Sequence, residues 1–365
     1  MESSAKTVIA IDAMGGDHGP SVVIAGIARA LRRRPDLRFL LHGDEGVIAP
    51  LLTRRAEVAA ACTVQHADDT VAMEDRPATA IRSRRQSSMW LALKSVAAGD
   101  ARVAVSAGNT GALLAMSVLL LRKAPGVDRP AIAVHWPAAA PHGFNTVLDM
   151  GADVRADPRN LLQFAVMGAA YARLSFGLDQ PRIGLLNMGT EETKGPRSVR
   201  EAAPLIAAAA ALPDARFSYE GFIEGNDIPG ARADVIVTDG FTGNVALKAA
   251  EGTATFIGQG LRKAFRHTWL SRLASLFAVT SLRRLSRRID PRRVNGGVFL
   301  GLNGSVVKSH GGADAVGFDA ALRLAADMAE ADFSTDLVRQ LANLPGAADH
   351  AVPVEDADQS GAGER

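Results

Sequence analysis

The feature that most constrains this chain is a repeated pattern in which a short apolar strand runs into a glycine-rich polar turn and then into a helix. The clearest copy spans residues 233–251, where a turn with two glycines follows the β-branched run Val235 to Val237. Such a run is typical of a parallel strand that is covered on both faces. Residues 245–248 predict the first turns of a helix that is capped near Thr242 or Asn244.

The same order recurs along the chain and predicts an α/β fold with a mainly parallel sheet. Other expected strands lie at residues 8–11, 37–41, 103–106, 146–148, 183–186 and 298–300. The carboxyl ends of parallel strands share one edge of a sheet, so we expect the glycine loops that follow them to meet in one cleft. Glycines let the backbone approach a ligand, and helix N-termini offer free N–H groups to an anion. The alternative is a set of tight connections that bind nothing.

Composition sets the remaining limits on the class of protein. The chain has 365 residues, of which 47% are hydrophobic and 22% charged, enough for one large domain or two sub-domains around a cleft. We expect a catalytic domain over residues 1–344 and a disordered tail over 345–365. The lone Cys62 excludes a disulfide framework and a cysteine metal site. The first residues contain no long apolar segment, which predicts a cytoplasmic protein, and a net charge of +2 argues against nucleic-acid binding.

Residues 261–294 are far more basic than the rest of the chain. They hold ten Lys and Arg residues against Asp290 alone, a net charge of +9, so the rest carries −7. Apolar residues recur there at helical spacing between the arginines, which is typical of a helix that lies on a membrane surface. We expect a protruding basic amphipathic segment that contacts an anionic membrane or an acidic partner; the alternative is a helical pair packed on the core. The expected contact residues are Trp269, Leu273, Leu276, Phe277, Arg283 and Arg284.

A second cluster of arginines lies before the helix expected at residues 87–98. It consists of Arg76, Arg82, Arg84 and Arg85. Such a cluster is commonly a solvated face, and the alternative is a surface that holds an acidic partner.

The chemistry of the chain is that of anion binding. The sequence has no G-x-S-x-G elbow and no H-E-x-x-H pair, so serine hydrolysis and zinc chemistry lack their usual residues. Glycine loops with Asn and Thr, together with Lys194, Lys308 and His310, can instead bind an anion and stabilise an oxyanion. These residues alone indicate a phosphate-handling transferase or an NAD(P)-dependent dehydrogenase of similar architecture. A third hypothesis, from the basic segment, is a membrane or nucleic-acid adaptor without enzymatic activity.

Four motifs narrow the choice. They are IAIDAMGGDHGP at 9–20, SAGNTGA at 106–112, VTDGFTGNVALK at 237–248 and LGLNGSVVKSHG at 300–311. In this order they resemble the phosphate acyltransferase (PlsX) family of bacterial phospholipid synthesis, over residues 8–342 or so. The sequence departs from the expected pattern at Asp153 and at 196–198.

The resemblance implies transfer of an acyl group from acyl-acyl-carrier protein to inorganic phosphate, without a cofactor or metal. It also implies a three-layer α/β/α fold similar to phosphotransacetylases and isocitrate-dehydrogenase-like enzymes, a homodimer, and peripheral membrane association near the membrane glycerol-3-phosphate acyltransferase that uses the product. Phosphate is already a nucleophile and a thiolate a good leaving group, so direct attack needs positioning and oxyanion donors rather than a covalent intermediate. The expected catalytic residues are Lys308, His310, Asn244 and Asp239. The expected phosphate or substrate ligands are Asp12, Gly15, Gly16, Asp17, Gly108, Asn109, Thr110, Asn187, Lys194, Thr242, Gly243 and Ser309.

Overall fold

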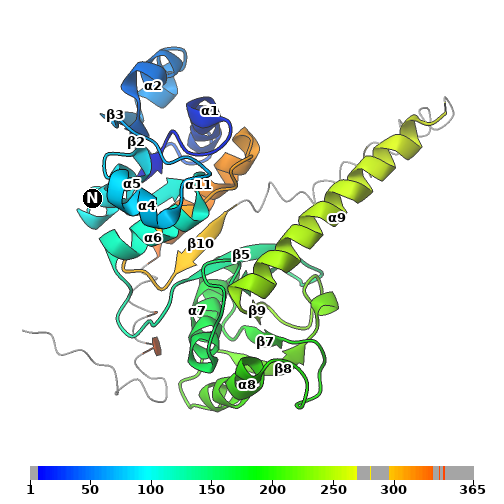
Figure 1. Ribbon diagram of the computed structural model, residues 1–365. Coiled ribbons are helices and arrows are strands. Elements are labelled where there is room, and N and C mark those ends of the chain that lie inside the picture. The colour runs from blue at the N-terminus through cyan, green and yellow to red at the C-terminus, as the bar shows by residue number, and fades with distance from the viewer. Residues whose placement is uncertain (1–6, 269–279, 281–295, 332–336, 338–339, 342–365) are drawn as a thin grey trace, which may run out of the picture.

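A computed structural model describes residues 7–268, 280, 296–331, 337, 340 and 341 (Figure 1). The strands are β1 (Val8–Asp12), β2 (Arg38–Gly43), β3 (Cys62–His66), β4 (Val103–Ser106), β5 (Ala131–Pro137), β6 (Phe144–Leu148), β7 (Arg182–Leu186), β8 (Ser218–Ile223), β9 (Val235–Val237), β10 (Gly297–Leu300) and β11 (Ser305–Lys308). The helices are α1 (Gly19–Leu31), α2 (Glu45–Leu52), α3 (Ala56–Ala59), α4 (Pro77–Ser83), α5 (Ser88–Ala97), α6 (Thr110–Leu121), α7 (Pro158–Phe176), α8 (Arg197–Ala210), the short 3-10 helix η1 (Gly225–Asp227), α9 (Gly240–Arg266) and α11 (Ala315–Glu330).

The strands of the described residues form one sheet in the order β3-β2-β1-β4-β11-β10-β5-β6-β9-β7-β8. Most pairs are parallel, and three in the middle are antiparallel: β11 with β10, β10 with β5, and β5 with β6. The prediction of a mainly parallel α/β sheet is therefore confirmed. The antiparallel pairs divide the sheet into two parallel blocks, β3-β2-β1-β4-β11 and β6-β9-β7-β8, that run in opposite directions.

This reversal corrects the expectation that all the glycine loops share one edge of the sheet, because that argument assumed one strand direction. Figure 1 shows the two blocks on either side of β10 and β5, with α1 and α11 beside the first block and α7 and α8 beside the second.

Helices cover both faces of the sheet, which confirms the three-layer arrangement. Along β4, Val103 and Val105 belong to the apolar cluster that contains residues of α1, α7, α8 and α11. Ala104 between them belongs to the cluster that contains residues of α5 and α6 and packs against Ala246 and Leu247 of α9. This alternation follows from the two-residue period of a strand. Helices α6 and α9, which both follow glycine loops, therefore lie on the same face.

Helix α9 begins earlier than the sequence indicated. Its N-cap is Asp239, whose Oδ1 accepts a hydrogen bond from the backbone N–H of Thr242 at 2.9 Å and whose Oδ2 accepts one from the Thr242 hydroxyl at 2.7 Å. The expected cap at Thr242 or Asn244 is therefore wrong, because an aspartate three residues upstream satisfies the first-turn N–H group. The helix then projects away from the body (Figure 1).

The far end of α9 contains the start of the predicted basic segment, Leu261 to Arg266. The six predicted membrane-contact residues and the predicted disordered tail lie outside the described residues, so those expectations stay predictions. No helix among the described residues is long and apolar enough to cross a membrane.

Candidate active site

Asp12, at the end of β1, joins three elements of the first strand block. Its side chain is buried, and Oδ1 accepts hydrogen bonds from the Ser88 hydroxyl at 2.6 Å and from the Gly15 backbone N–H at 3.2 Å. Oδ2 accepts one from the Ser106 hydroxyl at 2.7 Å. Burial raises the pKa of Asp12, and the hydrogen bonds from Ser106 and Ser88 oppose that rise. Both oxygens are thus engaged inside the protein, so Asp12 fixes the loops around it.

The three loops that follow β1, β4 and β11 pack against one another through glycines. A methyl group on Gly15 would lie 2.8 Å from the Gly108 backbone nitrogen, and one on Gly16 would lie 2.9 Å from the Gly311 carbonyl oxygen. Gly16 also has a φ of +88°, a conformation that L side chains rarely adopt. The Asp17 N–H donates a hydrogen bond to the Gly311 carbonyl at 2.9 Å. Convergence of loops is therefore observed within the first block.

Lys308 lies where these three loops meet. Its ammonium donates to the carbonyl oxygen of Ala107 at 3.3 Å and to that of Ser309. Burial lowers the pKa of Lys308 to about 8, the carboxylates of Asp12 and Asp17 act in the opposite direction, and the ammonium of Lys248 lowers it further. Lys248 belongs to α9, so a cation of the second block also acts on the charge of Lys308. The site therefore contains an ammonium group that is bound by carbonyl oxygens and has a pKa of about 8, close to neutral pH.

Ser309 and His310 continue from Lys308 into the loop after β11. Ser309 is buried, and its N–H donates to the Ser106 carbonyl at 2.8 Å, which extends the pairing of β11 with β4. His310 is exposed, and its Nδ1 accepts a hydrogen bond from the Gly312 N–H at 3.1 Å. With Nδ1 as an acceptor, a neutral imidazole carries its proton on Nε2. The Nε2–H of His310 can therefore donate a hydrogen bond to a bound substrate.

Asn109 and Thr110 are at the N-terminus of α6. Asn109 is the N-cap, with its Oδ1 accepting from the Ala112 N–H at 3.0 Å, while its Nδ2 donates to the carbonyls of Met73 at 2.8 Å and Asp75 at 2.9 Å. The side chain thus has structural partners at both ends. The first backbone N–H groups of a helix, here those of Thr110 and Gly111, have no acceptors within the helix and can bind an anion.

A second cluster lies at the start of α9. Gly243 packs on the loop after β6, because a methyl group there would lie 2.0 Å from the Asp149 carbonyl oxygen. Asn244 lies beside the same loop, since a methyl group on Gly151 would be 3.6 Å from its side chain. Buried Asp149, which the sequence did not single out, holds this loop through hydrogen bonds from four backbone N–H groups: Ile132, Gly151, Ala152 and Asp153. Gly243 therefore serves close helix–loop packing, whereas Asp239 and Thr242 bond to each other.

Asn187 and Lys194 form a third group in the loop after β7. The Asn187 Nδ2 donates to the Lys194 carbonyl at 3.0 Å, and the Lys194 ammonium forms an ion pair with Glu191 at 2.6 Å. The Glu191 carboxylate raises the pKa of Lys194. In the part of the chain that the structure describes, these contacts join Asn187 and Lys194 to each other and not to Lys308.

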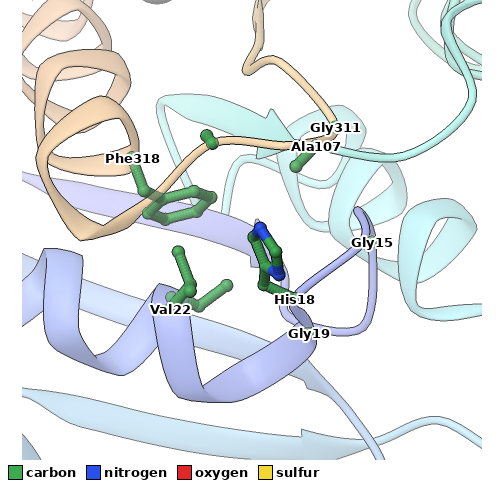
Figure 2. A pocket seen from close by; sticks show the side chains of 9 residues that line it. Gly15, His18, Gly19, Val22, Ala107, Gly311 and Phe318 are labelled. Atoms are coloured by element: carbon green, nitrogen blue, oxygen red, sulfur yellow. The ribbon is translucent and has the colours of Figure 1, made fainter. Parts of the chain in front are cut away.

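A small cavity lies beside the first-block loops, between the N-termini of α1 and α11 (Figure 2). Figure 2 shows the His18 ring between Phe318 and the loops that contain Gly15 and Gly311. Val22, Val23 and Ala313 complete an apolar wall. The cavity is next to the loops that surround Lys308 but does not include Lys308 itself.

Comparison with known proteins identifies the family. A family model described as "Fatty acid synthesis protein" matches residues 7–336. A relative from Ruegeria sp. (strain TM1040) named phosphate acyltransferase is 55% identical over 356 residues, which cover 98% of this chain and 94% of the relative. One with the same name from Paracoccus denitrificans (strain Pd 1222) is 53% identical over 341 residues, 93% of this chain and 92% of the relative. The chain belongs to the phosphate acyltransferase family.

As a member of the phosphate acyltransferase family, the chain is an enzyme, and the predicted family is confirmed. Solved structures support the fold. A phosphotransacetylase from Streptococcus pyogenes aligns with a TM-score of 0.59 at 16% identity, over 89% of this chain and 94% of that one. The EutD phosphotransacetylase from Staphylococcus aureus aligns with a TM-score of 0.55 at 18% identity, also over 89% and 94%. The phosphate acyltransferase fold is thus similar to that of phosphotransacetylases, as predicted.

Proposed function

We propose that the enzyme transfers a fatty acyl group from acyl-acyl-carrier protein to inorganic phosphate and so produces acyl phosphate for phospholipid synthesis. The family relationship supports transfer to phosphate over the NAD(P)-dependent alternative. The observation that carries the proposal is the partly buried ammonium of Lys308 at the meeting point of three glycine loops. An ammonium group in that position can bind a small anion such as phosphate.

Phosphate binds, in this proposal, between Lys308 and the N-terminus of α6. The Lys308 ammonium supplies positive charge, and the backbone N–H groups of Thr110 and Gly111 supply hydrogen bonds aligned with the helix dipole. The glycines at 15, 16 and 108 allow the loop backbones to approach the anion. Asp12 and Asn109 act indirectly by holding these loops in place.

The reaction is a direct attack on the thioester. A phosphate oxygen forms a bond to the thioester carbonyl carbon, the carbon–sulfur bond breaks, and the carrier thiolate leaves. The His310 Nε2–H can donate a hydrogen bond to the departing sulfur, and the thiolate takes its proton from solvent. Asn244, near the N-terminus of α9, is the proposed oxyanion donor from the second block. No nucleophilic side chain is needed for this sequence of steps.

The carrier protein and the membrane are the proposed partners of residues 261–294. The net charge of +9 in that segment favours an acidic carrier or an anionic lipid surface. Peripheral attachment would place the acyl phosphate where a membrane glycerol-3-phosphate acyltransferase can take it up. We also propose a homodimer, as the family resemblance implies.

The test is incubation of the purified protein with acyl-acyl-carrier protein, with and without phosphate. We expect free carrier thiol to appear only with phosphate, in equal amount to acyl phosphate that is trapped as a hydroxamate. Thiol release that does not depend on phosphate would contradict the proposal, and titration with NAD(P) would then test the dehydrogenase alternative.

A further inference from the structure

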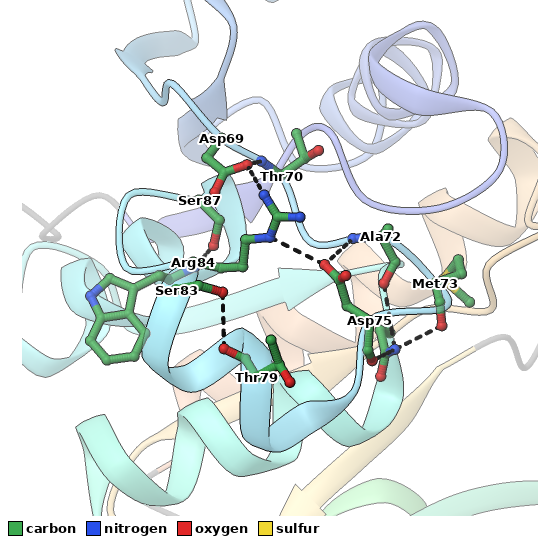
Figure 3. A network of polar contacts seen from close by, with 11 residues as sticks. Asp69, Thr70, Ala72, Met73, Asp75, Thr79, Ser83, Arg84 and Ser87 are labelled. Carbon is green, nitrogen blue, oxygen red and sulfur yellow. Dashed lines mark hydrogen bonds and ion pairs between the residues drawn. The ribbon is translucent and has the colours of Figure 1, made fainter.

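Residues 69–76, between β3 and α4, cross the loops of the proposed site and are here named the strap. Figure 3 shows Arg84 of the segment after α4 reaching two strap carboxylates. Its Nη1 donates to Asp69 Oδ1 at 2.8 Å and its Nε to Asp75 Oδ2 at 3.3 Å. The same Asp75 oxygen accepts a hydrogen bond from the Ala72 N–H at 3.1 Å. One guanidinium thus joins both ends of the strap.

The strap is tied in turn to α6. Asn109 Nδ2 donates to the carbonyls of Met73 and Asp75, while Asn109 Oδ1 caps the helix through the Ala112 N–H (Figure 3 shows the Met73 and Asp75 carbonyls). The contacts therefore run from Arg84 through Asp75 and Asn109 to the first turn of α6. That turn supplies the N–H groups that we assign to phosphate.

Two close approaches at glycines place the strap and the start of α4 beside the site. A methyl group on Gly311 would lie 3.4 Å from Met73 Cε, and one on Gly111 would lie 2.8 Å from Pro77. The strap and the start of α4 therefore touch both the loop after Lys308 and the first turn of α6. Ser88 also connects the strap to Asp12. Its N–H donates to the Asp69 carbonyl at 3.0 Å, and its hydroxyl donates to Asp12.

Arg84 is the arginine that pairs with both carboxylates of the strap. The side chains of Arg84, Asp69 and Asp75 are 36%, 30% and 23% exposed, so the pairs are partly shielded from water. A guanidinium can address two carboxylates in different directions, whereas a lysine ammonium is a single point of charge. Arg82, two residues earlier in α4, is exposed. Of the two, Arg84 is therefore the one whose charge is used inside the molecule.

We propose that Arg84 is a positioning residue of the acyl transfer, which holds the strap and, through Asn109, orients the first turn of α6 toward phosphate. This inference rests on the proposed function, because it assigns that turn to phosphate. It predicts an effect on phosphate binding that is larger than the effect on the chemical step.

The experiment compares Arg84→Gln with Arg84→Lys and with the control Arg82→Gln in the full-length protein. Arg84→Gln should raise the phosphate KM about tenfold, equivalent to about 1.4 kcal/mol, with kcat changed less than about twofold. Arg84→Lys should give an intermediate KM because one carboxylate can still be paired, and Arg82→Gln should match the wild type. The rise in melting temperature caused by inorganic phosphate, measured without acyl donor, should shrink in the same order.

A wild-type phosphate KM in Arg84→Gln, or an equal change in Arg82→Gln, would overturn the inference. If Arg84→Gln fails to fold, the near-isosteric Asp75→Asn tests the same contact, and a wild-type KM in that variant would also overturn it. If the wild type shows the phosphate-induced rise in melting temperature but no turnover, the proposed function fails. The strap inference is then judged on the order of the melting-temperature shifts alone.

Discussion

Replacing Lys308 by Met should lower activity without lowering stability. Burial reduces the pKa of Lys308 from 10.5 to about 8. Since one pKa unit corresponds to 1.36 kcal/mol, the partly buried ammonium costs the folded protein about 3 kcal/mol relative to a solvated lysine. Met removes that cost but leaves the carbonyls of Ala107 and Ser309 without the ammonium donor, at about 1 kcal/mol each. The free energy of unfolding at pH 7 should therefore rise by about 1 kcal/mol.

Activity should change in the opposite direction. Loss of one charged contact to phosphate is expected to raise the phosphate KM or lower kcat by about tenfold to a thousandfold. The assay is phosphate-dependent release of carrier thiol over a range of phosphate concentrations, and stability is measured by urea unfolding. Unchanged kinetics would remove Lys308 from the site. Destabilisation by several kcal/mol would show that the ammonium has a structural role that we have underestimated.

The pH dependence gives a second signature of Lys308. Between its folded pKa of about 8 and its unfolded value of 10.5, the unfolded chain binds more protons, so this group makes stability rise with pH across that window. The Met variant should lack that contribution. In the wild type, kcat/KM for phosphate should fall above pH 8 or so as the free enzyme loses the Lys308 proton. If kcat/KM falls above the same pH in the Met variant, the fall belongs to a titrating group other than Lys308.

Two further predictions concern α9 and the segment beyond it. Gly243→Ala should destabilise the protein by about 3 kcal/mol, because the new methyl group would clash with a loop carbonyl. Gly252→Ala has open space around it and should stabilise the protein by up to about 1 kcal/mol. Thermal unfolding measures both variants, and equal shifts in their melting temperatures would refute the packing role of Gly243. Replacing Leu273, Leu276 and Phe277 by polar residues should abolish salt-sensitive binding to anionic liposomes and leave the melting temperature nearly unchanged. A folded triple variant that still pellets with liposomes would show that these residues do not bind the membrane, and contact with the carrier protein or a second subunit would then be the alternative.

The sequence predicted the elements of the fold better than their directions. Residues 103–106 and 235–237 form strands with the predicted bounds, because short apolar runs that lead into glycine loops are strong local signals. Nothing in a strand's own residues shows which way its neighbour runs. The reversal of the second block comes from three antiparallel pairs that involve β5 and β11, and residues 131–137 and 305–308 were not predicted as strands.

The site was predicted in part for a related reason. Gly15, Gly108 and Lys308 were found because glycine loops and lone cations have a recognisable pattern, and the structure brings them together. Ser88 and Ser106, which hold Asp12, carry no such pattern, since a serine on a strand or helix is usually unremarkable. Other residues have partners that only tertiary structure could reveal. Gly243 packs on a carbonyl and Lys194 pairs with Glu191. Arg84, predicted to lie on a solvated face or a surface for an acidic partner, bridges two carboxylates.

The central claim is that phosphate itself attacks the acyl thioester, and one single-turnover measurement tests it most directly. The wild-type enzyme is mixed in excess with acyl-acyl-carrier protein in phosphate-free buffer, and free thiol and intact protein mass are followed before and after phosphate is added. We predict no thiol release and no acylated enzyme until phosphate is present, and then thiol and acyl phosphate in equal amounts. A burst of thiol before phosphate, with the mass of the enzyme increased by one acyl group, would contradict the claim.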